Sequence, residues 1–542
     1  MDVIEEGIRH DWWQGGVFYH IYPRSFADSD GDGVGDLRGI TDHLDQLNDG
    51  TPGSLGVTAI WLSPFYPSPM ADFGYDVSDY CDVDPLFGTL ADFDELVTEA
   101  HARGIRVLVD IVPNHTSDRH PWFLDARASR SHPKRDWYVW ADARPDGGVP
   151  NNWLSAFESV GPAWTFDSLT GQYYLHSFTP SQPDLNWWNP EVREAMAGVL
   201  RFWLKRGVDG FRIDVAHRLA KDPELDDNPP EVALLRRDLT VHEAPMHNID
   251  WPETHGVLRG FRQTLDEYGA IAVGEVGILD LRRLVRYYGA GDELHMAFNF
   301  KFWLQPWSGS AFRRVVDEVE GTLPGAGWPV YALSNHDIPR AISRYGTDGR
   351  HEARARLAAT MLFTLRGTPF VYYGEEIGMC DVTEAFAADP NGRDPCRTPM
   401  QWDAGPGAGF TAGRPWLTIP ESARWVNVAA QGDHPGSLLN LYRRLIWLRR
   451  GSAALQTGTY RGLPAADECV FAYERRSPDE DLLVALNFGD DRARLSGGDI
   501  GLPAAGERLL STRADVGAER VSLDPYDLQP LEGVVVRLGR QG

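Results

Sequence analysis

The sequence is poor in cysteine, in long apolar runs and in positive charge. Its four cysteines, Cys81, Cys380, Cys396 and Cys469, are widely spaced without a CxxC motif, so free thiols are expected rather than disulfides or a zinc site. No apolar run reaches 18 residues, so no membrane span is expected. Lysine and arginine total 52 against 78 acidic residues, a formal net charge of −26. Such a surface repels nucleic acid and anionic membranes, which are therefore poor partner candidates.

The N-terminal stretch MDVIEEGIRHDWW is acidic and contains no apolar segment typical of a secretory signal. It therefore predicts a cytoplasmic protein, which we expect to be a monomer or a homodimer. The 542 residues, 42% of them hydrophobic, suffice for a large barrel domain with one or two smaller domains. Nineteen tryptophans exceed ordinary core needs. Because indoles also stack on sugar faces, they make a carbohydrate site worth testing.

Eight short apolar segments separated by helical patterns predict a (β/α)8 barrel of the TIM type. The expected strands are Gly16–Arg24, Gly56–Leu62, Arg106–Val112, Gly210–Val215, Ala270–Val276, Leu294–Phe300, Pro329–Asp337 and Pro369–Gly374. Residues 1–113 and 186–451 are assigned to the barrel, with a polar insert at about 221–255. Residues 114–185 lose the strand–helix alternation and predict an inserted, β-containing domain after the third strand. Residues 452–542 alternate as β-strands do and predict a C-terminal antiparallel β-sandwich.

The stretch GVDGFRIDVAHRLA, residues 207–220, follows a predicted helix at Pro190–Arg206 and opens with the fourth strand. Side chains alternate along a strand, so Arg212 and Asp214 share one face. Charge at the end of a buried strand is costly unless it is paired. One interpretation is a structural ion pair. The other is a carboxylate nucleophile whose pKa Arg212 lowers.

Four acidic residues fall at the C-terminal ends of predicted barrel strands, where barrel active sites form: Asp110, Asp214, Glu275 and Asp337. Neighbouring strands lie about 4.8 Å apart, which places Asp214 and Glu275 near the roughly 5–5.5 Å separation of a retaining glycosidase. Glu275 lies among valines and has no arginine two residues before it. We therefore expect a raised pKa suited to an acid, and an ionised Asp214 suited to a nucleophile. Asp337 is then free to hold sugar hydroxyls.

The loop DSDGDGVGD, residues 28–36, resembles the ligand pattern of an EF-hand-type loop. Oxygen ligands would come from Asp28, Asp30, Asp32, the Val34 carbonyl and Asp36. Gly39 replaces the glutamate expected at the twelfth position, which favours one structural Ca²⁺ or Mg²⁺ over a calcium sensor. The alternative is a solvated turn rich in aspartate and glycine.

Taken together, the strand-end motifs resemble those of the α-amylase family of glycoside hydrolases. DIVPNH, GFRIDV, GEV and SNHD occur in the family's order, and QPDLN at Gln182 resembles the form in its α-glucosidase and oligo-1,6-glucosidase branch. The resemblance implies Asp214 as nucleophile, Glu275 as acid/base and Asp337 as stabiliser, with no cofactor for catalysis. It also implies a glucose-binding pocket formed by Asp72, Tyr75, His115, Phe178, Gln182, Arg212, His336 and, from GRDPCRTPMQWD, Arg397.

The resemblance implies a retaining, exo-acting α-glucosidase that releases glucose from short α-1,4 glucosides, and from α-1,6 glucosides or sucrose. Val215, after the nucleophile, resembles oligo-1,6-glucosidases, whereas the continuation AHRLAKDP resembles α-glucosidases that prefer α-1,4 substrates. An α-glucosyltransferase or a trehalose synthase-type isomerase would use the same covalent glucosyl-enzyme intermediate that a retaining α-glucosidase forms. A trehalose-6-phosphate hydrolase would need a phosphate clamp, for which the candidates are Arg127, Arg130, Lys134 and Arg135. A non-catalytic homologue should lack one of the acids or carry a membrane span.

Overall fold

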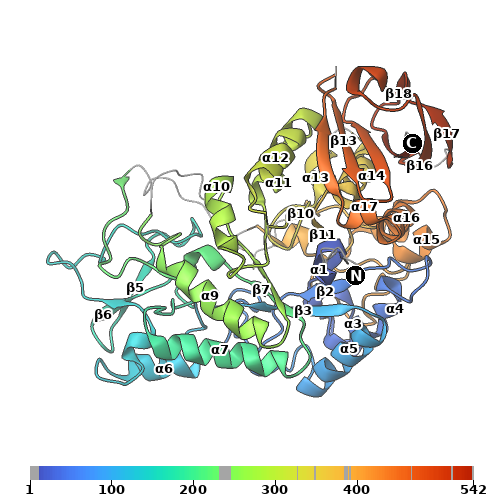
Figure 1. Ribbon diagram of the computed structural model, residues 1–542. Coiled ribbons are helices and arrows are strands. Elements are labelled where there is room, and N and C mark those ends of the chain that lie inside the picture. The colour runs from blue at the N-terminus through green and yellow to red at the C-terminus, as the bar shows by residue number, and fades with distance from the viewer. Residues whose placement is uncertain are drawn as a thin grey trace, which may run out of the picture.

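The computed structural model describes residues 11–230, 246–325, 327–346, 349–383, 389, 392–465, 467–513 and 517–539. At its centre lies a sheet of eight parallel strands in the order β10-β11-β1-β2-β3-β7-β8-β9 (Figure 1). In the described residues no ladder joins β9 to β10, so the sheet is a nearly closed barrel and the predicted fold is confirmed. The strands are β1 (Phe18–Ile21), β2 (Ala59–Leu62), β3 (Arg106–Ile111), β7 (Gly210–Ile213), β8 (Ile271–Gly274), β9 (Met296–Ala297), β10 (Val330–Ala332) and β11 (Thr368–Tyr372).

Helices cover the outside of this sheet (Figure 1), and the helix predicted at Pro190–Arg206 is observed as α7 (Pro190–Leu204). In α7, buried Val192, Met196 and Leu200 recur every four residues along one face, and the Asn189 side chain caps the first turn by accepting from the Glu191 amide. The longer helices are α5 (Leu90–Ala102), α6 (Pro121–Ala128), α7 (Pro190–Leu204), α9 (Glu253–Asp266), α12 (Gly309–Thr322), α14 (His351–Thr364) and α16 (Leu438–Arg450). Shorter ones are α1 (Trp12–Gly15), α2 (Pro23–Phe26), α3 (Leu37–Asp42), α4 (Leu44–Leu47), α10 (Leu281–Leu284), α11 (Phe300–Trp303), α13 (Ala341–Tyr345), α15 (Val428–Gly432) and α17 (Ala453–Gln456).

The register of β7 against β8 determines where two of the predicted acids lie. Gly210 pairs with Ile271, and Ile213 pairs with Gly274. A Cβ atom at Gly210 would lie only 2.7 Å from the Ile271 carbonyl oxygen, so this close approach of the two strands requires glycine. Because Ile213 and Gly274 are the last paired residues, the next residue on each strand, Asp214 and Glu275, leaves the sheet at the same level.

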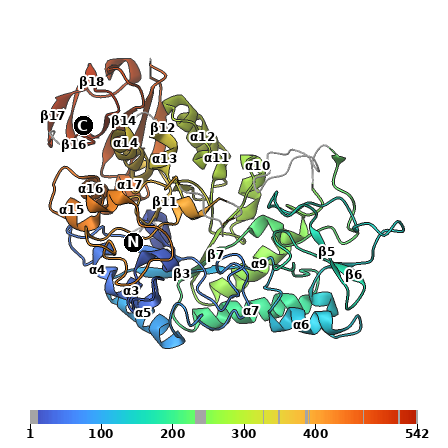
Figure 2. The same ribbon diagram turned by 180° about the vertical axis from the view of Figure 1, so that it is seen from behind.

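A small three-stranded sheet follows β3 and lies at the opposite end of the molecule from the C-terminal strands (Figures 1 and 2). Its strands are β4 (Trp140–Ala141), β6 (Gln172–Leu175) and β5 (Trp164–Asp167). A buried ammonium joins this segment to the barrel: Lys221 Nζ lies 2.8 Å from Asp184 Oδ2 and 2.7 Å from Asn114 Oδ1. Residues 231–245 of the predicted polar insert lie outside the described residues.

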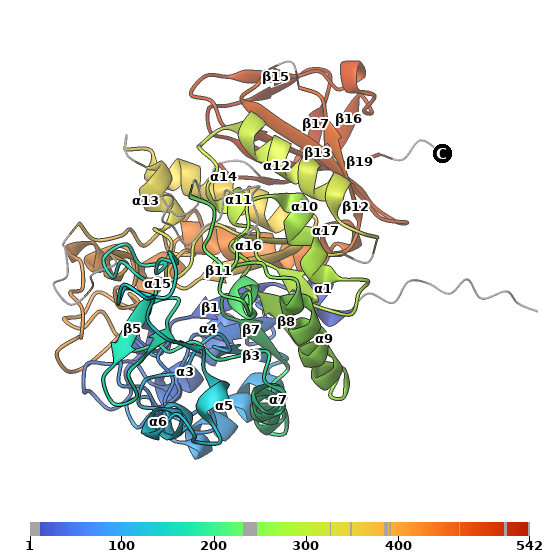
Figure 3. The same ribbon diagram turned by 90° about the vertical axis from the view of Figure 1, so that its left-hand side faces the viewer.

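The C-terminal region consists of antiparallel strands, as predicted. A six-stranded sheet has the order β12-β13-β14-β19-β16-β17, and β15 pairs with β18. The strands are β12 (Thr459–Leu463), β13 (Val470–Arg476), β14 (Asp481–Asn487), β15 (Ala493–Leu495), β16 (Ala505–Ser511), β17 (Glu519–Ser522), β18 (Tyr526–Leu528) and β19 (Gly533–Leu538). Helices α12 and α14 of the barrel pack against this sheet (Figure 3). Arg475 crosses the boundary by donating to the Thr364 carbonyl at 2.7 Å.

The cysteines and the helix lengths bear on the expected thiols and membrane spans. All four cysteines are free thiols. Within the described part of the chain, no helix has the length and apolar character needed to cross a membrane. Residues 1–10, which make up most of the acidic N-terminal stretch, lie outside the described residues.

Candidate active site

A cavity of about 480 Å³ opens at the C-terminal ends of the barrel strands. Eight of the predicted site residues line it together, from strand ends and from the inserted segment. They are Asp72, Tyr75, His115, Phe178, Gln182, Asp214, Glu275 and Asp337. Three others, Arg212, His336 and Arg397, are fully buried and lie behind this wall rather than on it.

A single guanidinium holds both members of the predicted catalytic pair. Arg212 donates from one terminal nitrogen to Asp214 Oδ1 at 2.7 Å and to Asp110 Oδ1 at 2.8 Å, and from the other to Glu275 Oε2. The carboxyl groups of Asp214 and Glu275 are therefore neighbours on the cavity wall. The expectation that Arg212 serves Asp214 and leaves Glu275 without an arginine is wrong, because the Arg212 side chain is long enough to span both strand ends.

The charge around Asp214 also differs from the prediction. Burial raises the pKa of the Asp214 carboxyl, Arg212 opposes this, and the nearby carboxyls of Glu275, Asp110 and Asp337 raise it further. The pKa of Asp214 therefore lies well above its usual value, whereas the sequence predicted that Arg212 would keep this group ionised. Burial likewise raises the pKa of Asp110 to about 7 despite Arg212. One shared guanidinium does not offset the burial of Asp110 and Asp214.

The turn after Asp214 is tied to Glu275. Val215 adopts a left-handed backbone conformation, with φ of 35°, which is rare for a β-branched residue. In this conformation the Val215 amide donates to Glu275 Oε2 at 3.2 Å, and the Ala216 amide donates to the Glu275 carbonyl at 2.8 Å. The strained turn thus holds the side chain and the backbone of Glu275 beside Asp214.

Asp337 lies among positive charges on the other side of the cavity. Arg397 and Arg393 donate to its Oδ1 at 2.8 and 3.1 Å, and His336 Nε2 lies 3.0 Å from its Oδ2. Burial alone would raise the pKa of Asp337, but His336, Arg393 and Arg397 outweigh burial and hold it well below the usual value. Asp337 is therefore an ionised carboxylate, as its predicted role in stabilising positive charge requires.

Four polar residues between these two sides form one hydrogen-bonded group. Gln182 Nε2 donates to Asp72 Oδ2 at 3.0 Å and lies 3.1 Å from His115 Nε2. Burial lowers the pKa of His115 to about 4, so its imidazole is neutral. The Tyr75 hydroxyl lies 2.7 Å from His336 Nε2 and 3.1 Å from Asp110 Oδ2. Such fixed donors and acceptors suit recognition of several hydroxyl groups on one sugar ring.

Arg393 is the main site residue that sequence reasoning missed. It lines the cavity and forms ion pairs with Asp72 and Asp337, so it bridges two loops across one side of the pocket. It comes from the same GRDPCRTPMQWD stretch as Arg397, which was predicted instead. The structure places Arg397 behind Asp337, where its Nε donates to the His336 carbonyl at 2.7 Å. Two arginines in one irregular stretch cannot be ranked from sequence, because no periodicity gives the direction of their side chains.

Apolar residues form a further wall of the cavity. Val215, Phe178 and Ala156 are buried together, with Phe157 packed against them. The sequence did not identify the remaining lining residues, which come from loops, from the helical turn after β7 and from the start of α11: Phe157, Glu158, Ser159, His217, Arg218, Gly277, Phe300 and Ile338.

The basic residues proposed for a phosphate clamp do not reach the cavity. None of the four is among its lining residues. Arg127, Arg130 and Lys134 form ion pairs with Asp167, Asp142 and Asp125. Arg135 donates to the Ala126 carbonyl and stacks on a tryptophan. The described residues therefore offer no support for a phosphate clamp built from these four side chains.

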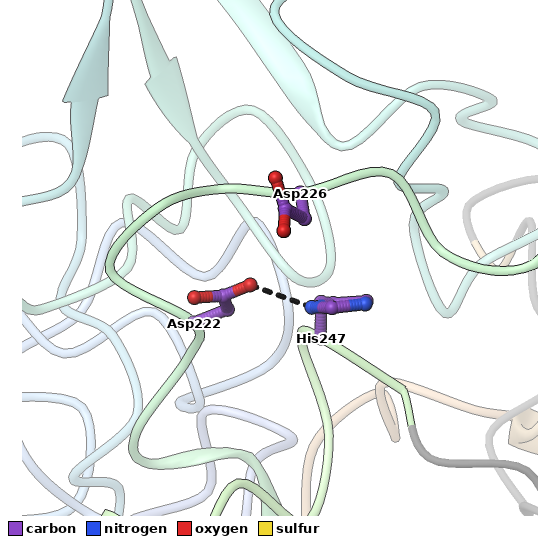
Figure 4. A group of neighbouring side chains, drawn as sticks. All are labelled: Asp222, Asp226 and His247. Carbon is purple, nitrogen blue, oxygen red and sulfur yellow. Dashed lines mark hydrogen bonds and ion pairs between the residues drawn. The ribbon is translucent and has the colours of Figure 1, made fainter.

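Among the described residues, two groups of side chains have the composition of a metal site. In the predicted loop, carboxylate oxygens of Asp28, Asp30 and Asp36 lie within 4.8 Å of one another. The second group, Asp222, Asp226 and His247, lies outside the cavity (Figure 4). There His247 Nδ1 lies 2.6 Å from Asp222 Oδ2, an imidazole–carboxylate pair that joins two loop segments.

Comparisons with known proteins agree with this geometry. The family model described as the alpha amylase catalytic domain matches residues 20–458. A protein named "Probable alpha-glucosidase" from Rhizobium meliloti (strain 1021) is 44% identical over 89% of this chain and 90% of its own. An oligo-1,6-glucosidase from Parageobacillus thermoglucosidasius is 40% identical over 88% and 91%.

A solved structure of an alpha-glucosyl transfer enzyme, XgtA, is also similar. It covers 98% of this chain and all of its own, with a TM-score of 0.87 and 41% identity. The matched family model and the relatives span most of the chain, including the strand ends that carry Asp214, Glu275 and Asp337. The chain therefore belongs to the α-amylase family of glycoside hydrolases.

Proposed function

We propose that this glycoside hydrolase is a retaining, exo-acting α-glucosidase that removes glucose from the non-reducing end of short α-glucosides. One observation carries the proposal: Asp214 and Glu275 are bound to opposite nitrogens of one guanidinium on the wall of a cavity large enough for a small sugar. Two adjacent carboxyl groups suit the retaining route, because an inverting enzyme needs space for a water molecule between them.

In this mechanism Asp214 attacks the anomeric carbon and forms a glucosyl ester, while Glu275 donates its proton to the departing glycosidic oxygen. Glu275 then removes a proton from water, which attacks the same carbon and releases glucose with its original configuration. The ionised Asp337 stabilises positive charge on the sugar ring in both transition states. Burial raises the pKa of Asp214, whereas attack requires its ionised form, so productive binding has to leave Asp214 ionised and the proton on Glu275.

The pocket wall supports exo-action. The ion pairs of Arg393 with Asp72 and Asp337 join two loops across one side of the cavity, which supports a pocket that ends there. A terminal glucose would then meet Asp72, His115 and Gln182 through its hydroxyl groups. Linkage preference would depend on the opposite side, where Val215 packs on Phe178. A difference of one methyl group there is worth about 1–3 kcal/mol, so both α-1,4 and α-1,6 bonds are expected to be cleaved, at different rates.

Hydrolysis rates on maltose, isomaltose, sucrose, trehalose and starch test the proposal. We expect glucose release from maltose or isomaltose, and from neither trehalose nor starch at comparable rates. Rapid cleavage of starch to long fragments would contradict exo-action.

A second candidate is glucosyl transfer from the same intermediate to a sugar acceptor. The structural likeness to an alpha-glucosyl transfer enzyme over the whole chain supports it. Product analysis at high maltose concentration distinguishes the two: an excess of new disaccharides and trisaccharides over free glucose would favour transfer or isomerisation.

We further propose that the loop at residues 28–36 holds one structural Ca²⁺ or Mg²⁺, away from the chemistry. Hard cations take carboxylate and carbonyl oxygens, which are the donor types that this loop offers. Burial raises the pKa of Asp32, and the neighbouring carboxylates of Asp30, Asp28 and Asp36 raise it further, which is a repulsion that a cation would relieve. The ligands would be Asp28, Asp30, Asp32, Asp36 and the Val34 carbonyl, and the ion would supply fold stability only.

A further inference from the structure

His217 lies between the two chain segments that carry the catalytic pair. It follows Asp214 by three residues, in the turn Ala216–Arg218 after β7, and its ring borders the cavity. The amide of Gly277, two residues after Glu275, donates to His217 Nδ1 at 3.2 Å. The backbone of His217 is itself fixed, because its carbonyl accepts from the Asp250 amide at 2.7 Å. The imidazole therefore joins a rigid turn to the loop that follows the acid.

The protonation state of this ring follows from its contacts. Nδ1 lies 3.4 Å from the Glu275 carbonyl oxygen and 3.2 Å from the Gly277 amide. The shorter contact is with the amide, which can only donate, so we assign Nδ1 as the acceptor and place the proton of the neutral ring on Nε2. Burial lowers the pKa of His217 well below its usual value, and Arg218 and Arg283 lower it further, so the neutral form persists. In the described part of the structure Nε2 is buried without a hydrogen-bond partner. The ring thus keeps an unsatisfied N–H, and its polar contribution to the site comes through Nδ1.

We propose that His217 is a positioning residue for the general acid: its Nδ1 holds the backbone after Glu275, and so keeps the Glu275 carboxyl directed at the glycosidic oxygen beside Asp214. This inference rests on the proposed function. Arg212 holds the Glu275 carboxyl directly, and the Val215 and Ala216 amides fix Glu275 from the side of the nucleophile turn. The His217 ring acts on the loop beyond Glu275 through the Gly277 amide, on the side away from the nucleophile turn. Loss of the ring should leave Asp214 in place and make the position of the Glu275 carboxyl less well defined.

A misplaced acid has a specific kinetic signature. Departure of a sugar or a basic phenol needs the proton from Glu275, whereas departure of an acidic phenol does not. The test is therefore the dependence of kcat/KM on the pKa of the leaving phenol, measured with a series of aryl α-glucosides and with maltose. The slope of this dependence does not change with the concentration of active enzyme, so partial misfolding of a variant cannot mimic the effect.

Two variants form a matched pair. In His217→Asn the Oδ1 atom can accept from the Gly277 amide in place of Nδ1, whereas His217→Leu keeps similar bulk and removes the acceptor. We expect His217→Leu to lose about 100-fold on maltose, to lose less than about tenfold on the dinitrophenyl glucoside, and to show a steeper slope. His217→Asn should restore a slope near that of the wild type. His120→Leu, which removes a buried imidazole outside the cavity, controls for the general loss of a core histidine.

The outcomes separate this inference from the proposed function. If His217→Leu keeps the wild-type slope, or loses the same factor on all substrates, His217 does not position the acid. If the dependence of kcat/KM on the pKa of the leaving phenol is as steep in His217→Asn as in His217→Leu, the Nδ1 contact is not the cause. If the wild type cleaves no α-glucoside at all, the proposed function fails first and this inference with it.

Discussion

The two sides of the cavity hold carboxylates in opposite electrostatic states. On one side Arg212 is the guanidinium shared by Asp110, Asp214 and Glu275. There burial prevails, and the pKa of Asp214 rises well above its usual value. On the other side Arg393 and Arg397 both contact Asp337, and its pKa falls well below the usual value although burial acts against it.

The difference follows the partners: one guanidinium is shared by three carboxyl groups on the first side, whereas His336, Arg393 and Arg397 all contact Asp337 and outweigh its burial. The side with one shared guanidinium carries the two reacting groups, the nucleophile Asp214 and the acid/base Glu275. The side rich in arginine keeps a permanent negative charge, which suits stabilisation of a cationic transition state.

The largest expected effect comes from the side of the cavity where Arg212 is shared by three carboxyl groups. Glu275→Gln should lose about 10²–10⁴-fold in kcat/KM on maltose, because the leaving sugar is no longer protonated. Asp214→Asn should lose at least as much, because no glucosyl ester can form. Asp110→Asn, which removes the third carboxyl on Arg212 but not a reacting group, is the matched control and should retain more activity than either. Equal losses in all three would show that the charge network matters and the assigned roles do not.

On the Asp337 side of the cavity, substitution of Arg393 and of Arg397 should have different effects. Arg393→Met removes a pocket wall and an ion pair to Asp72, and should lower kcat/KM on maltose by about 30-fold or more, mainly through KM. Arg397→Met leaves Asp337 buried with fewer partners and should lower the thermal midpoint more than Arg393→Met does. Thermal scans and steady-state kinetics on both variants check this. A larger KM effect from Arg397→Met would reverse the assignment.

The sequence predicted the eight strands, the inserted sheet and the acids at the strand ends, because periodicity and strand order determine these features. It did not predict that Arg212 also reaches Glu275, since this contact depends on the lateral reach of a side chain between two strands. Arg393 and His217 were missed for a related reason. They lie in irregular segments, where neither a period of 2 nor one of 3.6 tells which way a side chain points.

The opposite pKa directions also predict opposite stability effects. Asp214 has a raised pKa in the folded state, so it destabilises the fold increasingly as pH rises above the pKa that it has in the unfolded chain. Asp214→Asn should therefore raise the thermal midpoint at pH 7, by roughly 1–3 °C. Asp337 has a lowered pKa in the folded state, so it stabilises the fold at pH values above the pKa that it has in the unfolded chain. This stability is lost as pH falls towards the pKa of Asp337 in the folded state. Asp337→Asn should therefore lower the midpoint at pH 7. Calorimetry of both variants checks the signs, and shifts in the same direction would contradict the comparison.

The smallest effect is expected from metal removal, because the loop at residues 28–36 lies apart from both sides of the cavity. A chelator should lower the thermal midpoint, and added Ca²⁺ or Mg²⁺ should restore it, since a ligand that binds only the folded state stabilises it. Asp30→Asn should remove this response and leave kcat on maltose unchanged at a temperature where the variant is folded. A chelator response that persists in Asp30→Asn would place the ion elsewhere.

The configuration of the first product tests the central claim, that Asp214 and Glu275 act as a retaining pair, most directly. Proton NMR can follow the early hydrolysis of 4-nitrophenyl α-glucoside, which yields a single glucose per cleavage, before mutarotation mixes the anomers. The account predicts α-glucose as the first product. β-Glucose as the first product would mean direct attack by water, and would contradict the assignment of Asp214 as nucleophile.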